Sequence, residues 1–288
     1  MSNKDEPKHS FDAVRKEIVP DRGIALHEFG LDITQSVIND AYKNGAIQEP
    51  IYGVNEIIAS ESLARPKDKI NGSYSIGLLS EEFYKRGLAE KFDALTCSVG
   101  IDHARHFPAT LNIAVESVLS VSFWEKIDDH VKGVDPKNFI FEILEHDVDP
   151  NADISHLHEL KDMGYRFALD DYYGNKIDSR RLAVFGELVD YIKIDGPLVR
   201  AGLGDEVKGH SAEKFREVFD DIKARFPDVM LIAERVRSAE EAQKLFDMGF
   251  DGVQGRDLKP EFFHYTTEAM ALANQVAACD NNEHNLTL

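Results

Sequence analysis

The feature that most constrains the fold is a series of short apolar runs, several of which end in a carboxylate, an amide or a lysine. Strand-like runs occupy residues 47–54, 56–65, 110–115, 139–146, 166–172, 189–195, 229–236 and 250–255. From about residue 139 onward these runs alternate with amphipathic helical stretches, which is the pattern of repeated βα units around a parallel sheet. The sequence therefore predicts an α/β protein, a TIM-like (β/α)8 barrel.

The first two runs are joined by Gly53-Val54-Asn55, a link short enough for a hairpin. Because a hairpin joins antiparallel strands, we expect the first barrel strand to run antiparallel to its neighbour. A helix is predicted at about residues 78–105, between the second and third strands, and further helices between the later strands at residues 153–164, 179–188, 211–226 and 238–249.

A chain of 288 residues accommodates one such barrel. We place the barrel domain at residues 31–278, between an N-terminal extension of residues 1–30 and an Asn-rich C-terminal tail of residues 279–288.

The composition argues against several classes of protein. A formal charge of -19 disfavours sequence-independent binding to duplex nucleic acid, which requires Lys and Arg to neutralise phosphates. No apolar stretch is long enough to span a membrane, and the polar N-terminus lacks the apolar core of a secretory signal. We therefore expect a cytoplasmic protein without membrane contact. Cys97 and Cys279 are too few for a disulfide framework or a zinc site.

Polar side chains gather at the ends of the predicted strands, which face one mouth of a parallel barrel. They are Glu61, Asn112, Glu142, the pair Asp170-Asp171, Lys193, Glu234 and Gln254. Carboxylates that converge on one mouth repel each other unless a cation lies among them, and oxygen-rich clusters suit Mg²⁺ or Mn²⁺. A pair of such ions serves phosphoryl displacement, so the cluster predicts metal-assisted hydrolysis of a phosphate ester.

Strand alternation limits which of these side chains can meet. Glu142 and Glu145 are three residues apart and fall on opposite faces of a regular strand, so only Glu142 is expected to face the mouth. Asp170 and Asp171 diverge in a regular strand, and both can serve one site only where the strand turns into its loop.

Each residue also has a plain structural interpretation. Glu61 or Glu234 alone would more often be a helix cap or a loop anchor, and Asp170-Asp171 alone is typical of a turn. Lys193, inside an apolar strand, requires an anionic partner if it is buried. The alignment of so many strand ends on one face favours a functional site.

These residues resemble the EAL-domain phosphodiesterases that linearise cyclic di-GMP, over a span from about Gln48 to Pro260. The resemblance depends on seven motifs in order: Glu61-Ser62-Leu63-Ala64-Arg65, Leu111-Asn112-Ile113, Phe141-Glu142-Ile143-Leu144-Glu145, Asp170-Asp171-Tyr172, Lys193-Ile194-Asp195, Ala233-Glu234 and Gln254-Gly255. Each motif is weak alone, whereas their common order and spacing are specific.

The resemblance implies a (β/α)8 barrel whose first strand is antiparallel, with two Mg²⁺ or Mn²⁺ ions. It assigns one ion to Glu61, Asn112, Glu142 and Asp170, with Asp170 bridging to a second ion that is also held by Asp171 and Glu234.

The remaining roles also follow from the resemblance. Lys193 would hold the attacking water, and Glu234 is a candidate general base. Glu145 would tether the loop after the fifth strand. Contacts to the nucleotide are assigned to Arg65, Asp195 and Gln254. The implied ligand is cyclic di-GMP and the product is pGpG, with a homodimer and a regulatory protein partner as further expectations.

Several positions depart from the family pattern. Tyr173-Gly174-Asn175-Lys176-Ile177-Asp178 replaces a Gly-x-Gly loop, Ala233-Glu234-Arg235-Val236-Arg237 replaces Ala-Glu-Gly-Val-Glu, and Gly196-Pro197 replaces a segment that carries Arg. The first hypothesis is a cyclic di-GMP phosphodiesterase. The second is a catalytically impaired cyclic di-GMP sensor or protein-interaction module, and the third is a barrel that acts on another phosphodiester.

Overall fold

A computed structural model describes residues 46–64, 67, 68, 72, 73, 80, 83–263 and 265–281. The expected N-terminal extension and Arg65 lie outside the described residues. The last helix, α12 (Thr267–Asn281), continues past the expected domain boundary at residue 278. None of the described helices is both long enough and apolar enough to cross a membrane.

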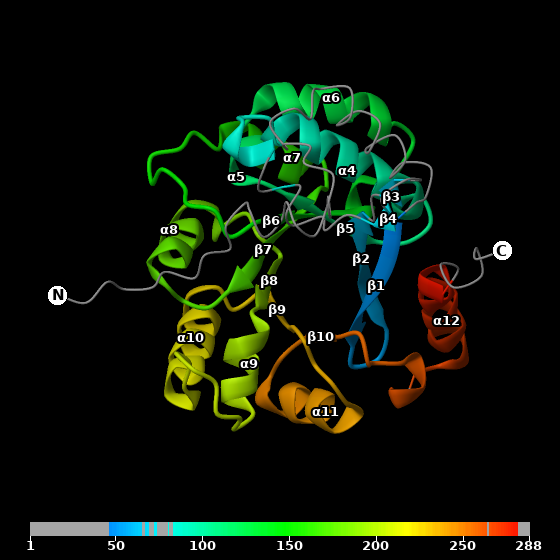
Figure 1. The fold of residues 1–288 in the computed structure, drawn as a ribbon, viewed down its shortest axis with the longest axis vertical. Helices are drawn as coiled ribbons and strands as arrows, with labels where there is room; N and C mark the ends of the chain where they lie inside the picture. Colours follow the sequence, from blue (N-terminus) through cyan, green and yellow to red (C-terminus); the bar gives the residue numbers. More distant parts are fainter. Residues whose placement is uncertain are drawn as a thin grey trace.

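Strands of the described chain close into a barrel in the order β1-β10-β9-β8-β7-β6-β5-β2 (Figure 1). Their bounds are β1 (Ala46–Gly53), β2 (Ile57–Ala64), β5 (Ala109–Ile113), β6 (Phe139–Ile143), β7 (Arg166–Tyr172), β8 (Tyr191–Ile194), β9 (Met230–Ala233) and β10 (Gly252–Gln254). Strand β1 is antiparallel to β2 and β10, whereas the other neighbouring pairs are parallel. The predicted barrel with an antiparallel first strand is confirmed. Strands β3 (Lys67–Asp68) and β4 (Gly72–Ser73) pair with each other outside it.

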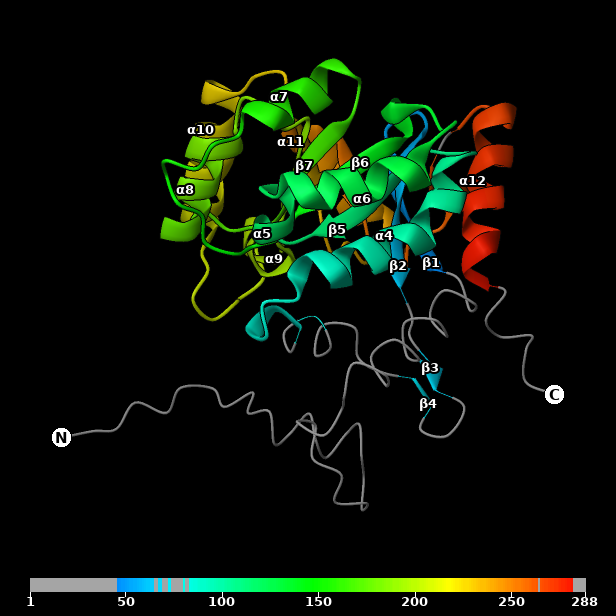
Figure 2. The same cartoon turned by 90° about the horizontal axis from the view of Figure 1, so that it is seen from above.

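Helices lie outside the ring of strands (Figures 1 and 2). They are α4 (Ala89–Ala104), α5 (Val115–Val118), α6 (Val121–Val131), α7 (Ser155–Asp162), α8 (Lys176–Phe185), α9 (Gly196–Gly202), α10 (Ala212–Arg225), α11 (Ala239–Met248) and α12, which packs on β1 and β2. Two short 3-10 turns, Pro136–Asn138 and Pro260–Phe262, complete the connections.

Two differences from the predicted helices have local causes. Helix α8 begins before residue 179 because Asn175 caps it: the Asn175 side chain accepts hydrogen bonds from the backbone N–H groups of Ile177 and Asp178. Helices α5, α6, α9 and α12 were not predicted. Helices α5 and α9 are too short to show a helical period in the sequence.

The inner face of the barrel has an apolar floor. Alternate strand residues meet there in a buried cluster of Ile51, Ala59, Ile140, Ala168, Tyr191 and Ile232. Residues two positions further along five of these strands are Glu61, Glu142, Asp170, Lys193 and Glu234, so they follow the floor residues on the inner side. Residues of opposite parity, such as Phe141 and Ile192, are buried beneath the helices. The floor therefore excludes water from below the polar residues.

A fully buried ion pair fixes the ends of two strands. The Arg181 guanidinium donates to Asp178 Oδ1 at 2.9 Å and to the backbone oxygen of Asp170 at 2.9 Å, and it also donates to the backbone oxygen of Ile143. Asp178 Oδ2 accepts from the backbone N–H of Tyr173 at 3.1 Å. The loop that departs from the family pattern is therefore tied to β6 and β7 through Arg181.

Replacing Arg181 by Met should lower the free energy of unfolding by about 3–5 kcal/mol, because it leaves the Asp178 carboxylate buried without its cation. Urea denaturation followed by circular dichroism measures this loss. The double variant D178N/R181M should recover part of the stability, and an Arg181→Met protein as stable as the parent would contradict the assigned role.

Candidate active site

The carboxyl ends of the strands bring the predicted polar residues to one mouth. Glu61 comes from β2, Asn112 from β5, Glu142 from β6, Asp170 and Asp171 from β7, Lys193 from β8 and Gln254 from β10, while Glu234 directly follows β9. The grouping follows from topology, because parallel strands of a closed barrel end on the same side.

Lys193 lies at the centre of this group and is almost fully buried, with a side chain 2% exposed. Its Nζ is 2.8 Å from Glu234, 3.0 Å from Glu142, 3.0 Å from Asp170 and 3.3 Å from Glu61. Lys193 therefore has the anionic partners that a buried ammonium requires.

Amide side chains hold Glu61 in place. Asn112 Nδ2 donates to Glu61 Oε1 at 2.9 Å, and Gln254 Nε2 donates to Glu61 Oε2 at 2.7 Å. Burial raises the pKa of Glu61, but the Lys193 ammonium and these hydrogen bonds outweigh burial and keep that pKa below its ordinary value. Glu61 is therefore held as a carboxylate.

The carboxylates of the cluster carry more negative charge than one lysine can neutralise. Burial raises the pKa values of Glu142 and Glu234 well above the ordinary range, and neighbouring carboxylates add to the increase. The pKa of Lys193 rises because the attraction of Asp170 and the other carboxylates exceeds the cost of its burial. Such a cluster binds protons or cations readily.

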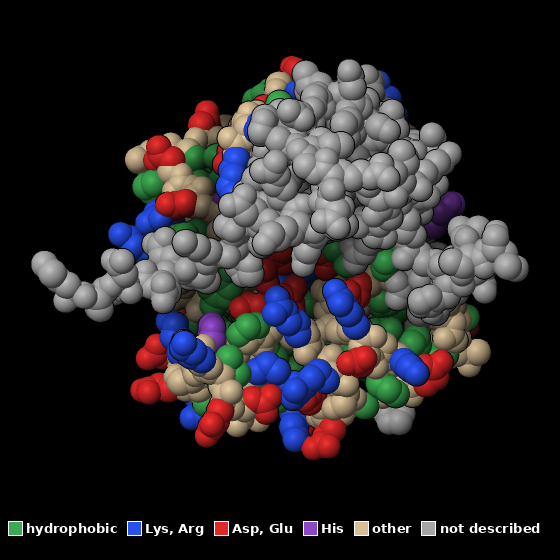
Figure 3. Space-filling view, in the orientation of Figure 1, with side chains coloured by type: hydrophobic (Ala, Val, Ile, Leu, Met, Phe, Trp, Pro, Cys, Tyr) green, Lys and Arg blue, Asp and Glu red, His purple; other side chains and the backbone are tan. Residues whose placement is uncertain are grey.

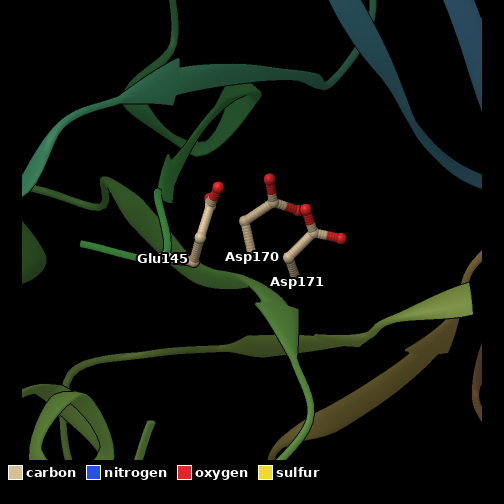
Figure 4. A group of neighbouring side chains, drawn as sticks. All are labelled: Glu145, Asp170 and Asp171. Carbon is tan, nitrogen blue, oxygen red and sulfur yellow. The ribbon is translucent and has the colours of Figure 1, made fainter. Parts of the chain in front are cut away.

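The pairing of β7 with β8 is irregular between Leu169 and Tyr172, where the aspartate pair lies. Asp171 has a φ of 45°, in the left-handed region that non-glycine residues seldom adopt. The strand thus turns at Asp171, and both Asp170 and Asp171 face the mouth (Figure 4).

The position of Glu145 differs from the one predicted. Strand alternation placed it away from the mouth, but β6 ends at Ile143 and Glu145 belongs to the loop that follows. Its carboxylate oxygen lies within 4.8 Å of oxygens of Asp170 and Asp171. Figure 4 shows the three side chains next to one another. Glu145 is thus a neighbour of the aspartate pair.

A second acidic group shares Asp171 with the first. Oxygens of Asp171, Asp195 and Glu234 also lie within 4.8 Å of one another. Burial raises the pKa of Asp171 to about 6, with the Asp170 charge as the next cause. Burial likewise raises the pKa of Asp195, which was assigned to the nucleotide from the sequence and lies in this acidic group.

The donor set fits hard divalent cations. Both acidic groups consist of carboxylates, and Asn112 adds an amide oxygen close to Glu61. Glu142 Oε1 and Gln254 Oε1 are buried and accept no hydrogen bond within the described chain. Oxygen ligands of this kind suit Mg²⁺ or Mn²⁺ and leave little for zinc, which favours His and Cys.

Two cavities flank the cluster, and both are lined by Glu61, Asp170 and Asp171. The first, of about 660 Å³, extends over Tyr84 and Asp93; the second, of about 740 Å³, extends over Arg235. Figure 3 shows acidic side chains deep in the mouth with Lys and Arg side chains beside them.

Sequence reasoning did not identify the residues Tyr84 and Asp93, which line the outer wall of the first cavity. Tyr84 and Asp93 come from the segment before β5, where strand-end reasoning gives no signal. Tyr84 Oη donates to Asp93 Oδ1 at 2.9 Å, and the backbone N–H of Ala114 donates to Asp93 Oδ2 at 2.8 Å. Asp93 belongs to α4, so these contacts join α4 to Tyr84 and to Ala114, which directly follows β5.

The chain is similar in sequence to known proteins. The family model described as the EAL domain matches residues 48–260. Among curated proteins, the cyclic di-GMP phosphodiesterase PdeL of Escherichia coli (strain K12) is 29% identical over 159 residues, which are 52% of this chain and 41% of PdeL. The chain spans about two fifths of the length of the curated relatives it matches.

Solved structures share the fold. The EAL enzyme Bd1971 in its cAMP- and cyclic-di-GMP-bound form has a TM-score of 0.63 and 19% identity, over 81% of this chain and 67% of Bd1971. The PaMucR phosphodiesterase in complex with c-di-GMP has a TM-score of 0.64 and 16% identity, over 79% of this chain and 96% of that one. At these identities the likeness concerns the fold.

Replacing Lys193 by Met should lower the free energy of unfolding in EDTA by about 3–5 kcal/mol, since it leaves several buried carboxylates without a cation. Adding Mn²⁺ should stabilise this variant more than the parent. Chemical denaturation with and without Mn²⁺ measures both effects. Equal stability of the two proteins in EDTA would show that Lys193 does not hold the cluster together.

Asp93 should make stability depend on pH, because burial raises its pKa from 3.8 to about 6 in the folded chain. Between about pH 4 and pH 6 the unfolded chain loses this proton first, so the free energy of unfolding falls as pH rises, by on the order of 3 kcal/mol. Below pH 4 both states are protonated and the effect vanishes.

The matched variant is Asp93→Asn, which can still accept from Ala114 and donate to Tyr84. Its unfolding free energy, subtracted from that of the parent at each pH, isolates the contribution of Asp93. A difference that is constant from pH 4 to pH 6 would refute the raised pKa.

Proposed function

The chain belongs to the EAL domain family, and from this membership and the geometry of the site we propose that it hydrolyses cyclic di-GMP to linear pGpG with the help of divalent cations. The observation that carries the proposal is the contact of Lys193 Nζ with four carboxylates. The curated relative PdeL, a cyclic di-GMP phosphodiesterase, supports the choice of substrate.

Two Mg²⁺ or Mn²⁺ ions fit the oxygen donors of the mouth. Glu61, Asn112, Glu142 and Asp170 would hold one, and Asp170, Asp171 and Glu234 the other. Asp195 lies close enough to join the second set, and Glu145 lies beside the aspartate pair. When bound, such ions neutralise charge on the phosphate and favour loss of a proton from water.

The side chains of the chain supply positioning and proton transfer. Lys193 donates hydrogen bonds to Glu61 and Glu142 in the middle of the cluster and would orient the attacking water. Glu234 Oε1 lies 2.8 Å from Lys193 Nζ, so a water oriented by Lys193 would lie within reach of this carboxylate, which is the candidate general base.

The proposed step is a single displacement at phosphorus. The water oxygen bonds to one phosphorus of the cyclic dinucleotide, while the bond from this phosphorus to the ribose 3′ oxygen breaks. Glu234 takes the proton of the water, and the released 3′ oxygen takes up a proton to become a hydroxyl. The product is a linear dinucleotide with a terminal 5′ phosphate.

The two cavities suit a substrate with two halves. They lie on either side of the same acidic residues, so the scissile phosphate can occupy the cluster while one nucleoside extends into each cavity. The first cavity offers the aromatic side chains of Tyr84 and Phe92 as apolar surface for a base.

Replacing Glu61 by Ala should lower the rate of cyclic di-GMP hydrolysis in Mg²⁺ or Mn²⁺ by at least about 1000-fold, because it removes a metal ligand and a partner of Lys193. Glu217→Ala, at an exposed position of α10, is the matched control and should retain activity. Chromatography of the nucleotides over time measures both rates.

Undiminished turnover by the Glu61→Ala protein would rule out this site. Tight binding of cyclic di-GMP by the parent without any product would instead favour the sensor hypothesis, and absence of both binding and product would favour a protein-interaction role.

A further inference from the structure

We propose that Arg235 binds a phosphate of the substrate at the rim of the mouth and so sets substrate affinity. This inference depends on the proposed function and adds a residue to it. Arg235 directly follows Glu234 and lines the cavity of about 740 Å³, with a side chain 66% exposed. It therefore places a cation next to the acidic cluster and within reach of a bound ligand.

The backbone at Arg235 is held in an unfavourable conformation. Its φ is 54°, in the left-handed region where residues with a side chain lose stability relative to glycine. Outliers of this kind persist where the surrounding structure fixes them, and they cluster at functional sites. A glycine would adopt this backbone without strain, so the Arg side chain is retained against a local cost.

Gly196 makes room for the Arg235 side chain. A Cβ atom built on Gly196 would lie 2.3 Å from Arg235 Cδ and 2.7 Å from Arg235 Cγ, distances that real atoms do not adopt. The stem of Arg235 thus lies across the backbone of Gly196 at the start of α9. Positions 196 and 235 are two of those that depart from the family pattern, and they are complementary in space.

Among the cations that line this cavity, Arg235 is the one best placed to bind an anion. Lys193 is surrounded by carboxylates, and Arg200 and Arg237 each contact both Asp205 and Glu241. Arg256 also lines this cavity and is exposed, but it follows β10, whereas Arg235 directly follows Glu234 of the acidic cluster. For Arg235 the nearest carboxylate found within the described chain is Asp195, at 3.9 Å, which is longer than a hydrogen bond.

The contact with Asp195 also indicates which part of the substrate Arg235 would bind. Asp195 belongs to the acidic group with Asp171 and Glu234, where a divalent cation and a phosphate would lie. A guanidinium presents donors that match phosphate oxygens, so the ligand assigned to it is a non-bridging phosphate oxygen.

The test is the variant Arg235→Gly, which removes the cation and leaves a residue that suits the left-handed backbone. Binding of cyclic di-GMP to the full chain is measured by isothermal titration calorimetry in Ca²⁺, which accepts oxygen ligands like Mg²⁺ but with a different geometry. The Kd should rise about tenfold, as for loss of one charge-assisted hydrogen bond, while thermal stability stays the same or rises. Arg235→Lys should lie between the parent and Arg235→Gly.

Two further variants separate the effect of the Arg235 side-chain position from the effect of removing a positive charge. Arg225→Ala removes an exposed cation from α10 and should leave the Kd unchanged. Gly196→Ala keeps the charge but displaces the Arg235 side chain, so it should weaken binding. Combined with Arg235→Gly it should add nothing, because the three atoms nearest to the added Cβ all belong to the Arg235 side chain.

The outcomes distinguish the two levels of the proposal. If the parent binds cyclic di-GMP and Arg235→Gly binds it equally well, the role of Arg235 is overturned and the proposed function stands. If the parent binds no cyclic di-GMP, both fail.

Between about 50 mM and about 500 mM NaCl the ratio of the two Kd values, for Arg235→Gly and for the parent, should shrink, since phosphate contacts at an exposed cation are screened by salt. A ratio independent of salt would contradict the phosphate assignment.

Discussion

The burial of one lysine among carboxylates is the constraint on which the rest of the site depends. Lys193 Nζ lies within 3.3 Å of oxygens from Glu61, Glu142, Asp170 and Glu234. A buried ammonium and a buried carboxylate are each costly alone, so the five side chains stabilise one another. Because four carboxylates exceed one ammonium, the cluster retains an excess of negative charge that divalent cations can balance.

The barrel supplies this arrangement through its topology. Parallel strands that close into a ring deliver side chains from distant parts of the sequence to one mouth, above an apolar floor that excludes water. Arg181 and Asp178 then fix the ends of β6 and β7 from outside the ring. The altered loop after Asp171 therefore contains the residue that caps helix α8, Asn175, and it leads into the buried ion pair of Asp178 and Arg181.

Much of this site was predictable because strand ends follow from sequence patterns. The barrel, its antiparallel first strand and the convergence of Glu61 with Lys193 all follow from apolar runs that end in polar residues. Strand alternation failed at Glu145 because β6 ends two residues earlier, which alternation does not reveal. The left-handed turn at Asp171 and the crossing of Arg235 over Gly196 depend on backbone dihedrals and contacts between neighbouring strands. Arg65, the remaining predicted nucleotide contact, lies outside the described residues and stays a prediction.

The most direct test of the central claim is mass spectrometry of the nucleotides formed when the purified chain is incubated with cyclic di-GMP and Mn²⁺ in ¹⁸O-labelled water. The account predicts linear pGpG with one ¹⁸O atom in its terminal phosphate, because one water attacks one phosphorus. Recovery of unlabelled cyclic di-GMP alone, or of a product without ¹⁸O on phosphorus, would contradict it.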